Sequence, residues 1–144
     1  PYRRQRQMCI RDREREQIRA ENRKAADRIL QLCRENGAQL LLVELPTVTS
    51  WNAARHRGVA EFAAARELEF LDLNLLYDQM GLDGAVAFRD AGNHLNVIGA
   101  TAVTAYLGRY IARQYRLPDL RGNSRYANRQ EEWVCYRRFV NGNV

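Results

Sequence analysis

The sequence predicts an α/β fold in which parallel strands are covered by helices, and three observations lead to this prediction. Patterns typical of helices and strands alternate along the chain, in the order helix, strand, helix, strand, helix. The first strand segment is a continuous apolar run without polar alternation, as expected of a strand that is buried on both faces. A single helix separates it from the second strand segment, and crossovers of this kind join parallel strands in a right-handed sense.

The first half of the chain supplies both strands and two of the helices. Apolar residues at three- and four-residue intervals predict a helix from about Glu14 to Glu35, and Gly37 can end it in the left-handed conformation. The run "AQLLLVELP", residues 38–46, predicts the first strand. A second helix is expected over about Asn52 to Arg66, and "LEFLDLN", Leu68–Asn74, reads as the second strand.

The second half of the chain combines a long irregular stretch with further helices. Residues 75–95 are expected to be irregular apart from a short helical turn at Leu75–Met80. Asn96 can supply the N-cap of a third long helix that runs to about Tyr115. Residues 116–128 read as a loop, and residues 129–140 as a short amphipathic helical end. The inward face of the third helix is expected to consist of Ile98, Val103, Leu107, Tyr110 and Ile111.

Two strands are too few for a stable three-layer domain, and the predicted order starts with a helix that has no strand behind it. We therefore expect residues 14–144 to be the C-terminal part of one larger α/β domain. This part would contain the last two strands of the domain and their flanking helices.

The first 13 residues differ from the rest in charge. They hold five arginines and one aspartate, so they carry +4 of the formal net charge of +6. They show no helical or strand periodicity, and the string "MCIRDR" resembles translated sequencing-adapter read-through. We expect residues 1–13 to be a non-native or disordered leader; the alternative is a solvated basic arm of the native protein.

Composition argues against several classes of partner. No aromatic and basic stripe that would stack bases is present, so we expect no nucleic-acid partner. No run approaches the roughly 20 apolar residues that span a bilayer, so we expect no membrane partner for this chain. The three cysteines are far apart and lack ligand spacing, which supports neither a disulfide framework nor a metal site.

The segment "DAGNHLNVIGA", Asp90–Ala100, holds the candidate catalytic residues. Asp90 and His94 share one loop, and a tight turn through Gly92 would bring the carboxylate and the imidazole together. A serine hydroxyl needs an imidazole to take its proton, and that imidazole needs a carboxylate to fix its tautomer. The loop follows the carboxyl end of the second strand, where open α/β sheets place their sites. The segment therefore predicts two of the three groups of a catalytic triad.

A second loop, Pro46–Arg55, is expected to form the neighbouring wall of this site. Trp51 could offer an apolar or sugar-stacking surface there, so Trp51 and Asn52 are candidate substrate-binding residues. The alternative for Trp51 is a hydrophobic residue that only covers the loop.

Four segments, in this order and at these spacings, resemble the C-terminal half of bacterial SGNH/GDSL-type hydrolases. They are "QLLLVELPTVTSWN", "EFLDLN", "DAGNHLNVIGATAVTAYLGRYI" and "LPDLRGNSRYANRQEEW". The resemblance covers roughly Glu14 to Trp133. It implies a flavodoxin-like three-layer α/β/α fold with a parallel sheet, of which this chain holds an incomplete part. It also implies hydrolysis of carboxylic esters, including acyl or acetyl groups on carbohydrates, by a Ser-His-Asp triad.

Carried onto this sequence, the resemblance makes His94 the general base and Asp90 the carboxylate that orients it. Three residues separate them here, where the commonest family pattern has two. The family's nucleophile lies in a Gly-Asp-Ser segment that has no counterpart in this sequence. We therefore expect the serine to lie upstream of residue 14, and this chain alone to be inactive. The resemblance implies no cofactor, and the expected substrate is a small-molecule or carbohydrate ester.

Several residues have plainer interpretations that stay open from the sequence alone. His94 could be a structural residue bonded to Asp90, and His56 is expected on a solvated helix face between two arginines. Ser50 could be a nucleophile within this chain, but "TVTSWN" lacks the glycines of a nucleophile elbow, so a helix cap is favoured. Asp72 ends a strand as a receiver phosphoacceptor would, without that site's acidic pair and lysine.

The alternative function is a non-catalytic α/β binding module whose basic N-terminal arm contacts an acidic polymer. Deletion of residues 1–13 would then remove salt-sensitive polyanion binding.

Overall fold

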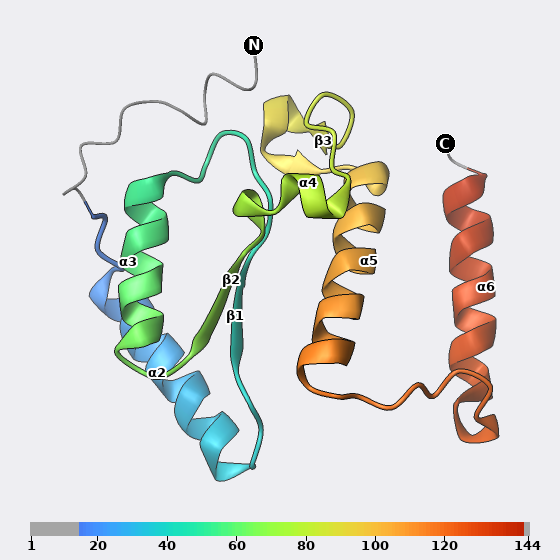
Figure 1. Cartoon of the computed structure of the whole chain (residues 1–144), viewed down its shortest axis with the longest axis horizontal. Coiled ribbons are helices and arrows are strands. Elements are labelled where there is room, and N and C mark those ends of the chain that lie inside the picture. Colours follow the sequence, from blue (N-terminus) through green and yellow to red (C-terminus); the bar gives the residue numbers. More distant parts are fainter. Residues whose placement is uncertain (1–14, 143–144) are drawn as a thin grey trace.

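The computed structural model of the chain describes residues 15–142, and Figure 1 shows the arrangement of its elements. Residues 1–13, which we expected to be a non-native or disordered leader, lie outside the described residues. The helices and strands are α2 (Ala20–Glu35), β1 (Leu41–Glu44), α3 (Ala53–Ala64), β2 (Glu69–Asp72), α4 (Tyr77–Met80), β3 (Phe88–Arg89), β4 (His94–Leu95), α5 (Val97–Gln114) and α6 (Ala127–Asn141).

Strands β1 and β2 pair in parallel, with Leu41 opposite Glu69 and Glu44 opposite Asp72. Helices α2 and α3 lie on one side of this pair and α5 on the other (Figure 1). Tyr110 of α5 and Tyr115, the residue that follows this helix, link it to the start of β2, because both hydroxyls donate to the Glu69 carboxylate. The hydrogen bond to Glu69 is the main reason that the pKa of Tyr110 is raised to about 12.

The predicted flavodoxin-like three-layer fold is wrong. The described residues contain only two short two-stranded sheets, the parallel β1–β2 pair and the antiparallel β3–β4 pair. The alternation of helices and strands predicted parallel pairing, but it carried no information on how many strands a sheet would gain. The residues that follow β2 turn back on themselves in the β3–β4 hairpin instead of extending the parallel sheet.

The core lies where the end of β2, the turn after it, α4 and α5 meet. Leu73 is fully buried in η1 (Leu73–Leu75), at the centre of this cluster. Leu41 and Val43 of β1 are only half-buried, although their apolar run predicted burial on both faces. The core is formed by Leu71, Leu73, Tyr77, Met80, Leu82, Ala87 and Val103.

Most element predictions agree with the structure, but two do not, and one residue that was predicted to face inward is exposed. Asn96 caps α5 as predicted, because its side-chain oxygen accepts the N–H of Gly99. The first helix begins later than predicted, at Ala20. The β3–β4 hairpin was missed because each of its strands has two residues, too few for a periodic pattern. Ile98, predicted to face inward, is exposed at the start of α5.

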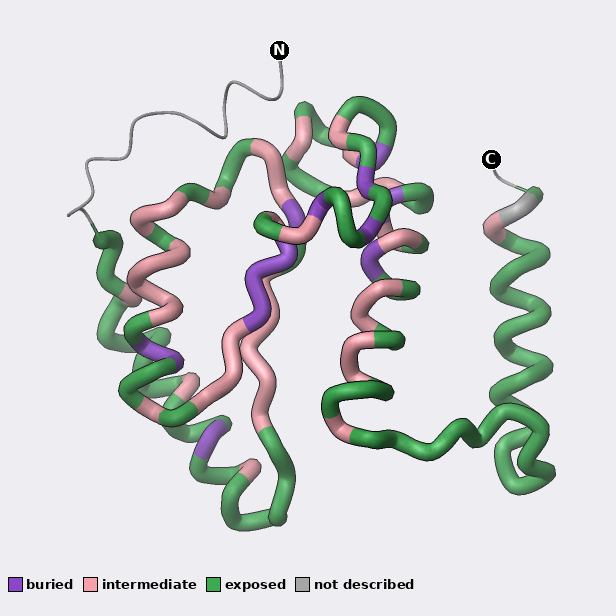
Figure 2. The backbone as a smooth tube through the Cα atoms, viewed as in Figure 1, coloured by how far each residue is buried: buried purple, intermediate pink, exposed green. Residues whose placement is uncertain are grey.

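Helix α6 stands apart from this body, and every residue from Ala127 to Phe139 is exposed (Figures 1 and 2). Its main packing partner is the short turn η3 (Ser124–Tyr126) that precedes it. Among the described residues, no helix combines the length and the apolar character that crossing a membrane requires.

Candidate functional site

The turn η2 (Asp90–Gly92) shapes the segment that holds Asp90 and His94. Asp90 and Ala91 both have positive φ values, 52° and 54°, which residues with a Cβ rarely adopt, and Gly92 follows at 95°. The turn sits between the two strands of the hairpin, in which Arg89 pairs with His94. Left-handed conformations at two non-glycine residues are a local strain of the kind that clusters at functional sites.

The turn brings Asp90 and His94 into direct contact. Nδ1 of His94 lies 2.9 Å from Oδ2 of Asp90, and the two side chains are 60% and 58% exposed. Since a carboxylate only accepts hydrogen bonds, Nδ1 carries the hydrogen in the neutral ring. The other nitrogen, Nε2, then holds a lone pair, and it has no hydrogen-bond partner among the described residues. This arrangement can accept a proton from a hydroxyl group that reaches the ring.

The turn is docked onto the loop between β1 and α3. The Gly92 carbonyl accepts hydrogen bonds from the Val48 backbone N–H at 2.8 Å and from the Thr47 hydroxyl at 3.4 Å. A Cβ at position 92 would lie 2.6 Å from the Cβ of Val48. Only glycine combines this close approach with the positive φ, so Gly92 fixes how the turn meets the loop.

A second histidine–carboxylate pair lies at the carboxyl ends of β1 and β2. Oδ2 of Asp72 lies 2.6 Å from Nδ1 of His56 and accepts the indole N–H of Trp51 at 2.8 Å. Oδ1 accepts the backbone N–H and the side-chain amide of Asn74, at 2.9 and 3.0 Å. The Asp72 side chain is 2% exposed and the His56 side chain 32%. Four donors therefore compensate the burial of this carboxylate.

The sequence reasoning missed this second pair. His56 was expected on a solvated face, and that expectation is wrong because the ring is half-buried between Asp72 and Phe70, whose ring centroid is 5.6 Å away. The arginines on either side of His56 suggested that this face of the helix is exposed to solvent. One feature of the sequence could have predicted the contact. Asp72 ends the second strand, and the helix that carries His56 connects the two strands and packs against them.

The loop residues predicted around the site have defined partners. Asn52 caps α3, with its side-chain oxygen accepting the N–H of Arg55 at 2.9 Å. The helix cap expected of Ser50 is therefore wrong, and its hydroxyl instead lies 2.9 Å from that of Thr47. Trp51 is half-buried and bonded to Asp72. Binding of substrate by Trp51 and Asn52 stays a prediction.

Glu44 adds a second carboxylate beside Asp72. The two residues are register partners at the ends of β1 and β2. Partial burial and, secondarily, the charge of Asp72 raise the pKa of Glu44, and Arg55 opposes this shift. The carboxyl edge of the parallel pair therefore concentrates negative charge on the side covered by α3.

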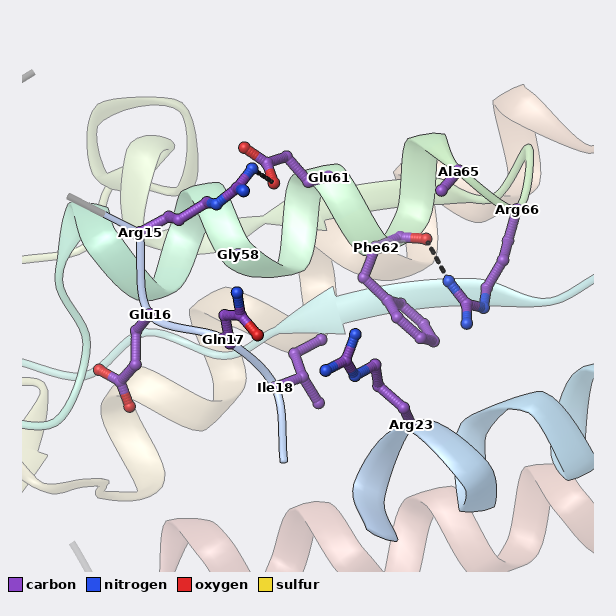
Figure 3. A pocket seen from close by; sticks show the side chains of 10 residues that line it. All are labelled: Arg15, Glu16, Gln17, Ile18, Arg23, Gly58, Glu61, Phe62, Ala65 and Arg66. Carbon is purple, nitrogen blue, oxygen red and sulfur yellow. Dashed lines mark hydrogen bonds and ion pairs between the residues drawn. The ribbon is translucent and has the colours of Figure 1, made fainter. Parts of the chain in front are cut away.

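A shallow hollow of about 220 Å³ lies on a different part of α3, between that helix and residues 15–18 (Figure 3). Charged side chains rim it, including the ion pair of Arg15 with Glu61 at 2.6 Å. The Arg66 guanidinium stacks over the Phe62 ring at 3.8 Å. None of the residues of either histidine–carboxylate pair lines this hollow.

Residues 15–142 contain no group of three or more His, Cys, Asp or Glu side chains that could hold a metal ion. Comparisons of the chain with protein-family models, with curated proteins and with solved structures found no match.

Proposed function

We propose that His94 and Asp90 are the general base and the orienting carboxylate of a serine hydrolase that cleaves carboxylic esters. The contact of 2.9 Å between Nδ1 of His94 and Oδ2 of Asp90, with the ring 60% exposed, carries this proposal. It leaves Nε2 as the free basic nitrogen of a ring whose Nδ1–H tautomer is favoured by Asp90, which is the state that a general base needs. The sequence resemblance to SGNH/GDSL-type hydrolases supports the same roles.

In the proposed reaction, Nε2 of His94 takes the proton of a serine hydroxyl while the serine oxygen bonds to the ester carbonyl carbon. The imidazolium gives this proton to the leaving alkoxide as the bond from carbon to oxygen breaks, and an acyl-enzyme remains. Nε2 then takes a proton from water as the water oxygen bonds to the acyl carbon. The bond from this carbon to the serine oxygen breaks, the imidazolium returns the proton to the serine, and the acid leaves. Asp90 stabilises the imidazolium in each half of the cycle and keeps the ring in position.

The proposal assigns the nucleophile to polypeptide other than residues 15–142. Two observations support this assignment. The only hydrogen-bond partner of the His94 ring among the described residues is Asp90, and the Ser50 hydroxyl is engaged with Thr47. The substrate class, a small-molecule or carbohydrate ester, rests on the resemblance and on Trp51, which shares a loop with the residues that contact Gly92.

Replacement of His94 by alanine tests the proposal in a polypeptide that joins this chain to its serine-bearing segment. We expect kcat/KM for a short-chain aryl ester to fall by about 10²–10⁴-fold, the usual contribution of a general base. Asp90→Asn should lower it to a similar extent, because the amide can donate to Nδ1 and hold the ring in the tautomer whose Nε2 carries the hydrogen. Unchanged turnover in His94→Ala would refute the assignment of the base.

Labelling of the 144-residue chain alone tests where the nucleophile lies. A fluorophosphonate probe reacts with an activated serine hydroxyl, so we expect no labelled serine in this chain. Labelling that disappears in Ser50→Ala would place the nucleophile in the loop between β1 and α3, and would contradict the proposed division.

A further inference from the structure

The two histidine–carboxylate pairs are connected by a chain of hydrogen bonds. From Asp72 the chain passes to Asn74, whose side-chain oxygen accepts the backbone N–H of Thr47 at 2.9 Å. Thr47 and its neighbour Val48 both donate to the carbonyl of Gly92. Gly92 belongs to the turn that carries Asp90 and leads into His94. Hydrogen bonds therefore connect His56 to Gly92, and the backbone of the turn connects Gly92 to the exposed pair.

The hydrogen bonds of the Asn74 side chain fix which way its amide group is oriented in this path. Its nitrogen donates to Oδ1 of Asp72 at 3.0 Å and to the carbonyl of Leu45 at 3.2 Å. With the nitrogen held by two acceptors, the oxygen has to face the N–H of Thr47. Asp72 therefore sets the position of the Thr47 backbone, and through it the position of the loop on which the Gly92 turn rests.

The exposed pair needs such support. An exposed ion pair holds its own geometry weakly, because water competes for both partners. The turn between its members contains two residues in the left-handed region, Asp90 and Ala91, which the surrounding structure has to maintain. The contacts made to the turn by the loop between β1 and α3 supply this support, with Thr49 also reaching Asn93 at 3.5 Å.

His56 is the group that completes the buried end of the path. It binds the same oxygen of Asp72 as Trp51, and of the four donors to that carboxylate it is the one that can carry a full positive charge. Removing it leaves a buried carboxylate short of a donor, which favours rearrangement of Asp72 and of the Asn74 amide bonded to it.

We propose that His56 is a positioning residue for the His94–Asp90 pair, acting through Asp72, Asn74 and the loop that binds Gly92. The effect of this positioning on catalysis rests on the proposed function. The positioning itself is a property of the hydrogen-bond path and can be measured without any reaction.

Imidazole nitrogen NMR tests the proposal on the 144-residue chain, because the sequence contains two histidines and a single substitution assigns each ring. In the unaltered chain we expect His94 to favour the Nδ1–H tautomer, which binds Asp90. In His56→Ala the ratio of this tautomer to the Nε2–H form should fall about threefold, a size typical of weakening an exposed pair. His56→Gln, which can still donate to Asp72, should restore most of the ratio.

A matched control separates positioning from general destabilisation. Phe62→Leu alters a buried residue of the same helix that is outside the path, and it should leave the His94 ratio unchanged. If His56→Ala does not fold, Asn74→Ala interrupts the path while the His56–Asp72 contact remains, and it should lower the ratio to the same extent.

Two outcomes would overturn the proposal: an unchanged His94 ratio in the folded His56→Ala or Asn74→Ala chain, or an equal fall in Phe62→Leu. These outcomes differ from failure of the proposed function. Full ester turnover in His94→Ala would remove the catalytic role and leave the structural coupling in place.

Discussion

The two histidine–aspartate pairs use the same atoms in opposite surroundings. In each pair Nδ1 of the imidazole faces Oδ2 of the carboxylate, at 2.6 Å for His56 and Asp72 and at 2.9 Å for His94 and Asp90. The first pair joins a helix to a strand across 16 positions of sequence, whereas the second spans four positions of one turn. The carboxylate of the first pair is buried, and that of the second is open to water.

Because the pairs differ in burial, we expect the first to contribute to the stability of the fold and the second to offer a reactive ring nitrogen. A buried carboxylate that accepts four hydrogen bonds stabilises the fold because its removal leaves donors such as the Trp51 indole N–H without the partner they have in the structure. An exposed pair contributes little to stability, but its free ring nitrogen is accessible to a reacting group. We therefore expect substitutions at the first pair mainly to change the free energy of unfolding, with an effect on the second pair only through the proposed path, and substitutions at the second pair to change reactivity.

The largest expected effect follows from Asp72→Asn. The amide cannot serve all four donors that the carboxylate binds, so the free energy of unfolding should fall by about 3 kcal/mol. Asp90→Asn is the matched control and should cost less than about 1 kcal/mol, because that pair is exposed. Chemical denaturation of the two variants measures both values, and equal losses would contradict the contrast between the pairs.

A smaller effect is expected for Trp51→Phe. This change removes the indole N–H that donates to Asp72 and keeps most of the ring, so unfolding should become easier by about 1–2 kcal/mol. Denaturation with urea measures the change. A loss close to zero would indicate that the indole N–H stabilises the fold little, and would favour the substrate-binding role predicted for Trp51.

The smallest effect concerns Glu44, whose pKa is raised above its ordinary value of 4.5. A carboxyl group with a raised pKa in the folded state stabilises the fold below pH 4.5, and this contribution is lost as the pH rises through the raised pKa. Glu44→Gln removes the charge beside Asp72, so the variant should be more stable than the unaltered chain at pH 7. The difference should shrink below pH 4.5. Thermal unfolding at pH 4 and pH 7 measures it, and a variant that is less stable at pH 7 would contradict this account.

Local patterns predicted the elements better than their assembly. Asn96 caps its helix as expected, since a cap depends on residues within one turn. The flavodoxin-like fold failed because the number of strands in a sheet depends on which edges find partners, which no local period records. The contact of Asp90 with His94 was predictable because both residues lie in one short segment with Gly92, whereas the contact of His56 with Asp72 depends on α3 returning over β2.

The sequence by itself determined where most helices and strands begin and end, and that an imidazole and a carboxylate would share the turn through Gly92. These features depend on side-chain period, caps and backbone freedom, which act over a few residues. The tertiary structure alone decided that β1 and β2 form a two-stranded sheet, that Asp72 is buried beneath His56 and Trp51, and that the loop beside them holds the Gly92 turn. Those contacts join segments distant in sequence, and their stability comes from burial and hydrogen bonding that exist only once the chain has folded.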